Sequence, residues 1–489
     1  ARSGCNPQLR IALAAACEAL GAMQPALLAL NKLEIKQVQL DSLSWLVLPG
    51  LRSCGFWEIA HKHCNLILGW HDRTIRDVSN GIREAYEKGN FMQATDMTDF
   101  QRRRLGRSLQ LAEAKTETIT YDLALGEAPL PGATAYLQSL ASGLSPLSLP
   151  TGADALAALS CNHDFGAAVT YVHQGDPAAR DAARRARRVA GVAARRALLG
   201  ALLGALQGDT QKVPASLPKI EELLAEAGYV LPGEVGVEEI EVQLAETKMD
   251  GSRVKSPPCV ERFQGAVFAA YLLGLRLLSE LTQVFQASGG SVAASAVSEL
   301  VCCMEKLSAQ CQVIDSFLAE KNISFFGTSD ASEEVLVYSE RWIKGISFFA
   351  VEALPYLCII FEKCIHFLPK RKKNKKKGKA AEILDTREIK DTKKLFKSMF
   401  EKFITMMVGI CQSLSSAEER EPRDQNMILS TFLAAEIPLP FLFERQENQE
   451  LLNCFLLKRD GLLMSHKASL GKLLGVIKLK LGALQALPL

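Results

Sequence analysis

The 489-residue sequence lacks the motifs by which most enzymes hold a nucleotide or a nucleophile. It contains no G-x-x-x-x-G-K-[ST] loop, no G-x-G-x-x-G fingerprint and no G-x-S-x-G elbow. It has no C-x-x-C pair, and its histidines have no zinc-ligand spacing: His61 and Cys64 share a helix face, but His63 points elsewhere. We therefore expect no catalytic residue, no metal and no cofactor.

Net charge and long apolar runs are also scarce. A net charge of +3 gives no global field for nucleic acid, so we expect no DNA partner. The longest uncharged apolar run, 263–275, is too short for a bilayer, so no membrane-spanning helix and no membrane partner are expected. Most of the 13 cysteines lie at apolar helical positions, which is typical of a reducing compartment and predicts a cytoplasmic protein.

What the sequence does contain is a 34-residue repeat over residues 11–104. Its glycines are each followed by a large apolar residue two positions on and by an alanine five positions on: Gly21, Met23 and Ala26; Gly55, Trp57 and Ala60; Gly89, Phe91 and Ala94. This period and pattern are typical of tetratricopeptide (TPR) repeats.

The residue types suit such helix pairs. Glycine ends the first helix because it adopts a left-handed backbone at low cost, and alanine allows two helix backbones to approach closely. The pattern predicts helices over 41–54 and 57–68, then over 75–88 and 91–104. We expect an all-α, TPR-like α-solenoid of stacked helix pairs, followed by longer C-terminal helices. An ordinary helical bundle with chance periodicity is the alternative.

Composition divides the chain into three parts. Residues 1–125 hold the TPR-like repeats, 126–259 form an irregular and Ala/Arg-rich connecting region, and 260–489 form a C-terminal helical region. The middle part has seven arginines between Arg180 and Arg196, which we interpret as a solvated connecting helix. Within it, Arg188 to Ala193 fits R-x-x-G-x-A, the acetyl-CoA loop of GNAT acetyltransferases. No strand precedes it, so we interpret the match as coincidence.

A lysine-rich segment at 370–379 interrupts the C-terminal helices. Eight of its ten residues are basic: Lys370, Arg371, Lys372, Lys373, Lys375, Lys376, Lys377 and Lys379. Such a run cannot pack and predicts a solvated loop. Two interpretations remain open: a contact with the ribosome, RNA or another polyanion, and a solubilising loop with no partner.

Several residues resemble a known family. Gln39 to Leu43, Gly89-Asn90, Phe100, Arg104-Leu105, Ser108, Gln110 and Cys161 to Phe165 resemble the auxiliary subunit of the N-terminal acetyltransferase B complex (NatB), and the lysine-rich loop also fits. The resemblance covers most of the chain, is strongest over 35–112 and is weak over 126–260. Because the chain opens at Ala1 inside a repeat, we expect an N-terminally truncated fragment.

The resemblance implies a non-catalytic scaffold. Such subunits are TPR solenoids that wrap a small GNAT catalytic subunit and anchor it near the ribosome, and the complex acetylates nascent chains beginning Met-Asp, Met-Glu, Met-Asn or Met-Gln. The auxiliary chain holds no acetyl-CoA. The alternative is a TPR-type adaptor that binds peptides or RNA with no associated enzyme.

Overall fold

A computed structural model describes residues 6–19, 21–126, 130–142, 147, 156, 158–167, 177–209, 211–231, 258–286, 294–326, 334–367, 387–419 and 446–487. Within these ranges the regular elements are helical, apart from one isolated parallel bridge between Ser108 and Ser160. The predicted all-α class is therefore confirmed for the described part of the chain.

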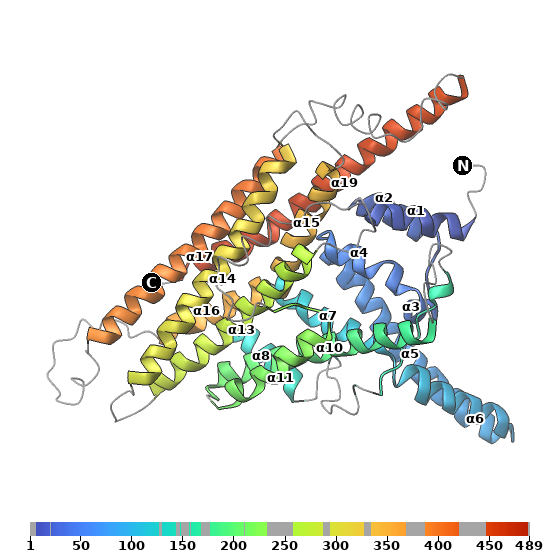
Figure 1. The fold of residues 1–489 in the computed structure, drawn as a ribbon. Coiled ribbons are helices and arrows are strands. Elements are labelled where there is room, and N and C mark those ends of the chain that lie inside the picture. The colour runs from blue at the N-terminus through green and yellow to red at the C-terminus, as the bar shows by residue number, and fades with distance from the viewer. Residues whose placement is uncertain are drawn as a thin grey trace.

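The N-terminal part of the chain contains one helix of 31 residues among several shorter elements (Figure 1). They are α1 (Pro7–Ala19), α2 (Met23–Asn31), α3 (Gln39–Ser42), the 3₁₀ turn η1 (Ser44–Leu46), α4 (Leu48–Ser53), α5 (Trp57–Glu87), α6 (Phe91–Phe100), the π turn η2 (Gln101–Leu105) and α7 (Leu109–Leu125). The end of α5 and all of α6 project from the body of the molecule (Figure 1). Asn90 begins α6 because its Oδ1 accepts a hydrogen bond from the amide of Gln93, at 3.2 Å.

The helix pairs differ from those that the repeat predicts. The predicted 57–68 and 75–88 helices are one continuous helix, α5, since apolar residues recur at Ala60, Cys64 and Ile67 and no proline intervenes. The predicted 41–54 helix is instead broken into α3, η1 and α4, because Pro49 has no amide proton to continue it. The second and third units are therefore not separate TPR hairpins.

The rest of the described chain contains helices of 12 to 40 residues and one 3₁₀ turn. They are α8 (Leu130–Ala141), the 3₁₀ turn η3 (Phe165–Ala167), α10 (Pro177–Gln207), α11 (Lys212–Glu226), α13 (Pro258–Gln286), α14 (Ala294–Phe326), α15 (Glu334–Glu352), α16 (Leu354–Phe367), α17 (Arg387–Glu419) and α19 (Gln446–Gln485). Helices α13, α14 and α17 run side by side, and α10 crosses beneath α7 (Figure 1).

One hydrophobic core connects these parts. It runs from Ala14 in α1 to Leu484 in α19, and it includes the apolar half of α10 at Leu198 and Leu202. A smaller cluster joins α7 to α10 through Leu109, Ala112, Leu159 and Val192. Residues 182–187 of the Ala/Arg-rich helix are exposed and its apolar half is buried, but the prediction of a solvated helix is wrong for Arg188 and Arg195, whose side chains are mostly buried in ion pairs.

The final helix returns to the N-terminal third. Lys480 Nζ donates hydrogen bonds to the carbonyls of Leu123 and Gly126, at 2.9 and 2.8 Å, and so caps the end of α7. Ser465 Oγ accepts a hydrogen bond from the amide of Gln24 at 2.9 Å. These contacts fix α19 against both α2 and α7.

Two helices are long and apolar enough to cross a membrane by length and composition, Ala182–Gln207 and Phe263–Val284, and the bent pair α15 and α16 would make a third. Their most apolar windows are 67% and 83% buried inside the protein. The apolar surface of these two helices is therefore covered mainly by the chain's own core.

Candidate functional site

The residues that define the repeat occupy the three N-terminal turns. Gly21, Gly55 and Gly89 have positive φ values of 70°, 79° and 72°. The three alanines, Ala26, Ala60 and Ala94, are at most 1% exposed. Met23 and Trp57 are buried, but Phe91 is 63% exposed and packs edge-on against Tyr86, so the third unit does not bury its large residue.

A buried carboxylate organises the region just beyond these turns. Asp41, in α3, is 3% exposed and accepts hydrogen bonds from three side chains. His71 Nε2 lies 3.1 Å from Oδ1, Ser108 Oγ donates to the same oxygen, and Asn162 Nδ2 lies 2.6 Å from Oδ2. We call Asp41, His71, Ser108 and Asn162 the Asp41 hub. It joins α3, α5 and the start of α7 to a segment far along the chain.

The hub contains serine, histidine and aspartate, but its geometry is not that of a catalytic triad. A triad needs serine hydrogen-bonded to histidine, whereas here both donate to one carboxylate. Ser108 Oγ also accepts the amide of Leu111 at 3.0 Å as the N-cap of α7. His71 and Ser108 are 1% and 2% exposed, so no substrate reaches them. The arrangement is suited to fixing helices and not to chemistry.

Residues 158–164, which we call the strap, lie across the hub. The Ser160 amide donates to the Arg107 carbonyl at 2.7 Å, and the Ser160 carbonyl accepts from the Leu109 amide at 2.9 Å. The Asp164 amide donates to the Ser42 carbonyl at 3.0 Å. The strap is thereby fixed at one end to Arg107 and the start of α7 and at the other to α3.

His163 of the strap connects the hub to α10. It lies 2.6 Å from Gln110 Oε1 through Nε2, and its Nδ1 accepts a hydrogen bond from Arg188 Nη1 at 3.0 Å. Arg188 also pairs with Glu113 of α7, with Nε 2.6 Å from Oε1. Trp45 stacks on the His163 ring at a centroid distance of 6.4 Å. Side chains from η1, α7, the strap and α10 thus meet at one point.

The pKa values of these groups follow from burial and hydrogen bonding. Burial alone would raise the pKa of Asp41, but hydrogen bonds from His71, Ser108 and Asn162 lower it below its ordinary value. Burial, together with the charge of Arg188, lowers the pKa of His163 to about 3. Burial likewise lowers the pKa of His63 to about 4. Both imidazoles are therefore neutral at physiological pH.

A second buried polar cluster joins the N-terminal helices to α15. Arg52 of α4 lies 2.9 Å from Glu117 of α7 and also pairs with Glu352. Arg195 of α10 lies 3.0 Å from the same Glu352 carboxylate. Burial opposes the charge of Arg52, but the charge of Glu117 together with Tyr121, Tyr229 and Tyr356 outweighs it, and the arginine's pKa is raised. The positive charges of two arginines and the negative charges of two carboxylates thus neutralise one another where α4, α7, α10 and α15 meet.

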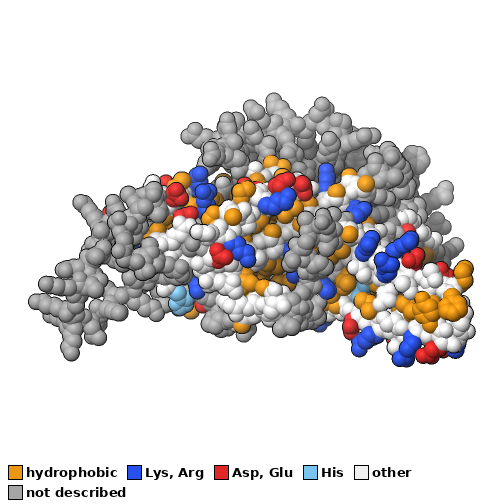
Figure 2. Space-filling model, turned by 90° about the horizontal axis from the view of Figure 1, so that it is seen from below, with side chains coloured by type: hydrophobic (Ala, Val, Ile, Leu, Met, Phe, Trp, Pro, Cys, Tyr) orange, Lys and Arg blue, Asp and Glu red, His pale blue; other side chains and the backbone are white. Residues whose placement is uncertain are grey.

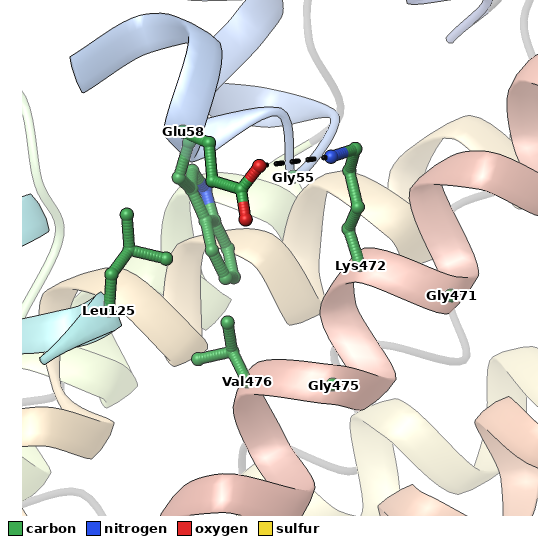
Figure 3. Close-up of a pocket in the computed structure, with 8 residues that line it drawn as sticks. Gly55, Glu58, Leu125, Gly471, Lys472, Gly475 and Val476 are labelled. Carbon is green, nitrogen blue, oxygen red and sulfur yellow. Dashed lines mark ion pairs between the residues drawn. The ribbon is translucent and has the colours of Figure 1, made fainter. Parts of the chain in front are cut away.

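A pocket of about 210 Å³ lies between the start of α5 and α19 (Figure 3). Trp57, Leu125 and Val476 form apolar walls, and glycines of α19 leave room for it. Its charged groups, Glu58 and Lys472, face each other at 3.7 Å. The pocket offers no acid–base pair beyond this ion pair.

Other residues singled out by the sequence have separate partners. His61 pairs with Asp122 at 3.2 Å and His63 bonds Ser44 at 2.8 Å, and no cluster able to hold a metal ion occurs among the described residues. Gly191, in the acetyl-CoA-like sequence, lies inside α10, where no strand-to-helix loop exists. The lysine-rich segment 370–379 lies outside the described residues.

The sequence did not reveal the hub as a site. Asp41, Ser108, Gln110, Asn162 and His163 all belong to the stretches that resemble the family, but their contacts join residues 53 to 121 positions apart. The periodicity of a sequence predicts which residues lie on the same face of one helix, but it does not predict contacts between residues this far apart. The available signal was that polar residues occupy these otherwise apolar, buried stretches.

The N-terminal region that contains the hub is similar to known proteins. Residues 1–165 match the family model described as N-acetyltransferase B complex (NatB) non catalytic subunit. Over 120 residues, the chain is 31% identical to N-alpha-acetyltransferase 25, NatB auxiliary subunit, of Homo sapiens and of Rattus norvegicus. The aligned part is 24% of this chain, and the chain spans about 12% of the length of these curated relatives. All four residues of the Asp41 hub lie within the matched range.

Proposed function

We propose that this chain, whose residues 1–165 match the family model of the NatB non-catalytic subunit, is a scaffold that holds a GNAT-type catalytic subunit. The observation that carries the proposal is the Asp41 hub. It uses the family-like residues, lies in the matched range, and is built to fix helices rather than to react. A scaffold needs such rigidity, because a preorganised surface loses little entropy when it binds.

The work of the complex is then divided between two chains. The catalytic subunit supplies the acetyl-CoA site and acetylates nascent chains that begin Met-Asp, Met-Glu, Met-Asn or Met-Gln. This chain supplies a helical frame in which the buried charges of Arg52, Glu117 and Glu352 are paired with one another. Its acetyl-CoA-like sequence plays no part, since Gly191 lies within α10.

Co-purification tests this proposal. We expect the full chain to retain a GNAT-type subunit in stoichiometric amount when the two are co-expressed, and to have no activity on a Met-Asp peptide by itself. Exchange of exposed Asp72 for Asn is the control, and Asp41→Asn should weaken capture because it loosens the frame. If no GNAT-type protein is retained while peptides or RNA are, the chain is a TPR-type adaptor with no associated enzyme.

Association with the ribosome, and with it a cytoplasmic location, completes the proposal. Basic residues at 370–379 are suited to phosphates, and their contacts release counterions without recognising sequence. We expect glutamine at the eight basic positions to weaken co-sedimentation with ribosomes at low salt and to leave acetylation of free peptides by the complex intact. Unchanged sedimentation at both of two salt concentrations would show that this segment is only a solubilising loop.

A further inference from the structure

The three repeat turns differ in how well their large residues are buried. Met23 and Trp57, in the first two turns, are 0% and 1% exposed, whereas Phe91, in the third, is 63% exposed. The backbone is not the cause, because the glycines of all three turns have similar positive φ values. The difference therefore comes from what packs on each turn.

Helix α19 covers the first two turns. Ser465 Oγ accepts a hydrogen bond from the amide of Gln24, in the first turn, at 2.9 Å. At the second turn, Leu473 lies so close that a Cβ added at Gly55 would be 3.1 Å from its side chain. Ser465 and Leu473 are eight residues apart, which is about 12 Å along a helix. One helix thus runs across two successive repeat turns.

Small residues of α19 leave room for the large side chain of the second turn. Trp57 lines a pocket together with Gly471, Gly475 and Val476 of α19. Residues four apart lie on the same face of a helix, and two glycines there provide space for an indole ring. The surface that covers a repeat turn is therefore an apolar helix face with small residues one turn apart.

Among the described residues, no helix covers the third turn in this way. Helix α6 packs mainly against α5 and η2, at the end of the hairpin that projects from the body (Figure 1). A Cβ added at Gly89 would meet no atom within 4 Å. Tyr86, Phe91 and Met92, which we call the tip, are 54%, 63% and 79% exposed. Figure 2 shows hydrophobic side chains gathered on this projecting end.

The tip is a rigid apolar surface. The Asn90 amide donates to the Ala85 carbonyl at 2.8 Å, and Tyr86 packs edge-on against Phe91 at a centroid distance of 5.9 Å. These two are the aromatic side chains among the large hydrophobic residues that the described part of the chain exposes. Aromatic residues and methionine are enriched in protein interfaces, and a rigid turn loses little entropy when it binds. The tip therefore has the properties of an interface centre.

The charges around the tip favour an apolar protein partner over a polyanion. Arg83 pairs with Glu87 at 3.9 Å, and Lys88 pairs with Glu84 at 2.5 Å, both within α5. Residues 89–95 contain no charged residue. A standard interface buries about 800 Å² on each partner, more than three side chains supply. The tip is thus suited to be one contact of a larger interface with a protein.

We infer that the tip docks on an apolar helix of the GNAT-type catalytic subunit, which covers the third repeat turn as α19 covers the first two. The inference rests on the proposed scaffold function and names one surface by which the scaffold holds its partner. By analogy with α19, the partner helix carries glycine, alanine or serine one turn apart, and the Phe91 ring lies against these small residues.

The test uses the full chain and the purified GNAT-type subunit, with affinity measured by biolayer interferometry. The tip variant changes Phe91 and Met92 to Ser. We expect at least about a tenfold loss of affinity, mainly through faster dissociation, because aromatic residues at the centre of an interface contribute much of its binding energy. The control changes Leu9 and Leu28, exposed on α1 and α2, to Ser, and its affinity should stay within about threefold of the unchanged chain.

Photocrosslinking identifies the surface that the tip contacts. With p-benzoylphenylalanine in place of Phe91, we expect crosslinks to residues of the GNAT-type subunit that are three or four positions apart, the spacing of one helix face. Mass spectrometry locates them. Circular dichroism checks that every variant is folded.

Three outcomes would overturn the inference. They are equal affinities for the tip variant and the unchanged chain, crosslinks that fall outside a helix, and a dimer of the unchanged chain that the tip variant abolishes. The dimer, measured by light scattering, would show that a second copy of this chain occupies the tip. A tip variant that binds the GNAT-type subunit normally refutes this inference alone, whereas failure of the unchanged chain to bind that subunit refutes the scaffold proposal as well.

Discussion

Replacing Asp41 with Asn tests whether the hub holds the N-terminal helices together. The side chain keeps its shape, but three hydrogen bonds to a charged acceptor become at most two to a neutral one. Each of the two that remain weakens by about 1 kcal/mol, and the amide leaves one buried donor unpaired at a cost of about 1–3 kcal/mol. We expect the free energy of unfolding to fall by about 3–5 kcal/mol.

Urea denaturation, monitored by tryptophan fluorescence, measures the change in the free energy of unfolding with probes close to the hub. Trp70 packs edge-on against His71 at 4.5 Å and so reports on the hub, and Trp45 stacks on His163 and so reports on the adjacent strap. The control is Asp72→Asn, whose carboxylate pairs with Arg76 but is 70% exposed, and we expect a loss below about 0.5 kcal/mol. Equal midpoints for the two variants would refute the argument that the hub is structural.

Two further predictions concern pH and the repeat turns. Because burial lowers the pKa of His163 to about 3 and of His63 to about 4, the unfolded chain binds more protons below pH 6.5; the urea midpoint should therefore fall as pH decreases from about 6.5 to about 4, and a flat midpoint would contradict this. Gly55→Ala and Gly89→Ala both impose a left-handed alanine, costing about 1–2 kcal/mol, but only at Gly55 would the new Cβ lie 3.1 Å from Leu473. The melting temperature should fall further for Gly55→Ala, and equal decreases would show that Leu473 moves freely.

Local features of the fold were predictable from the sequence. Helix-forming composition predicted the all-α class, and the three glycines predicted where the chain reverses, because a left-handed turn depends on that residue alone. The continuous α5 was not predicted. The 34-residue template required a break after Leu68, whereas the apolar stripe through Cys64 and Ile67 continues without a proline.

The hub and the contact between the strap and α10 could not be predicted from the sequence for a different reason. The hydrogen bond between Asn162 and Asp41 spans 121 positions, and that between Arg185 and Leu159 crosses a stretch of mixed composition. Neither pair shares a helix, so no period connects them. Their positions depend on how α7 and α10 pack around Leu159, which only the three-dimensional fold specifies.

The hydrogen bonds from Lys480 to the end of α7 delay the completion of α7 during translation. The lysine is made 357 residues after Leu123, and translation proceeds at about 5–20 residues per second, so α7 waits roughly 20–70 s for its cap. In a repeat array each unit is completed by its neighbour and can fold as it emerges. Here α7 is complete only after α19, much later in the chain, has been made. Loss of Lys480 would leave the carbonyls of Leu123 and Gly126 without this cap.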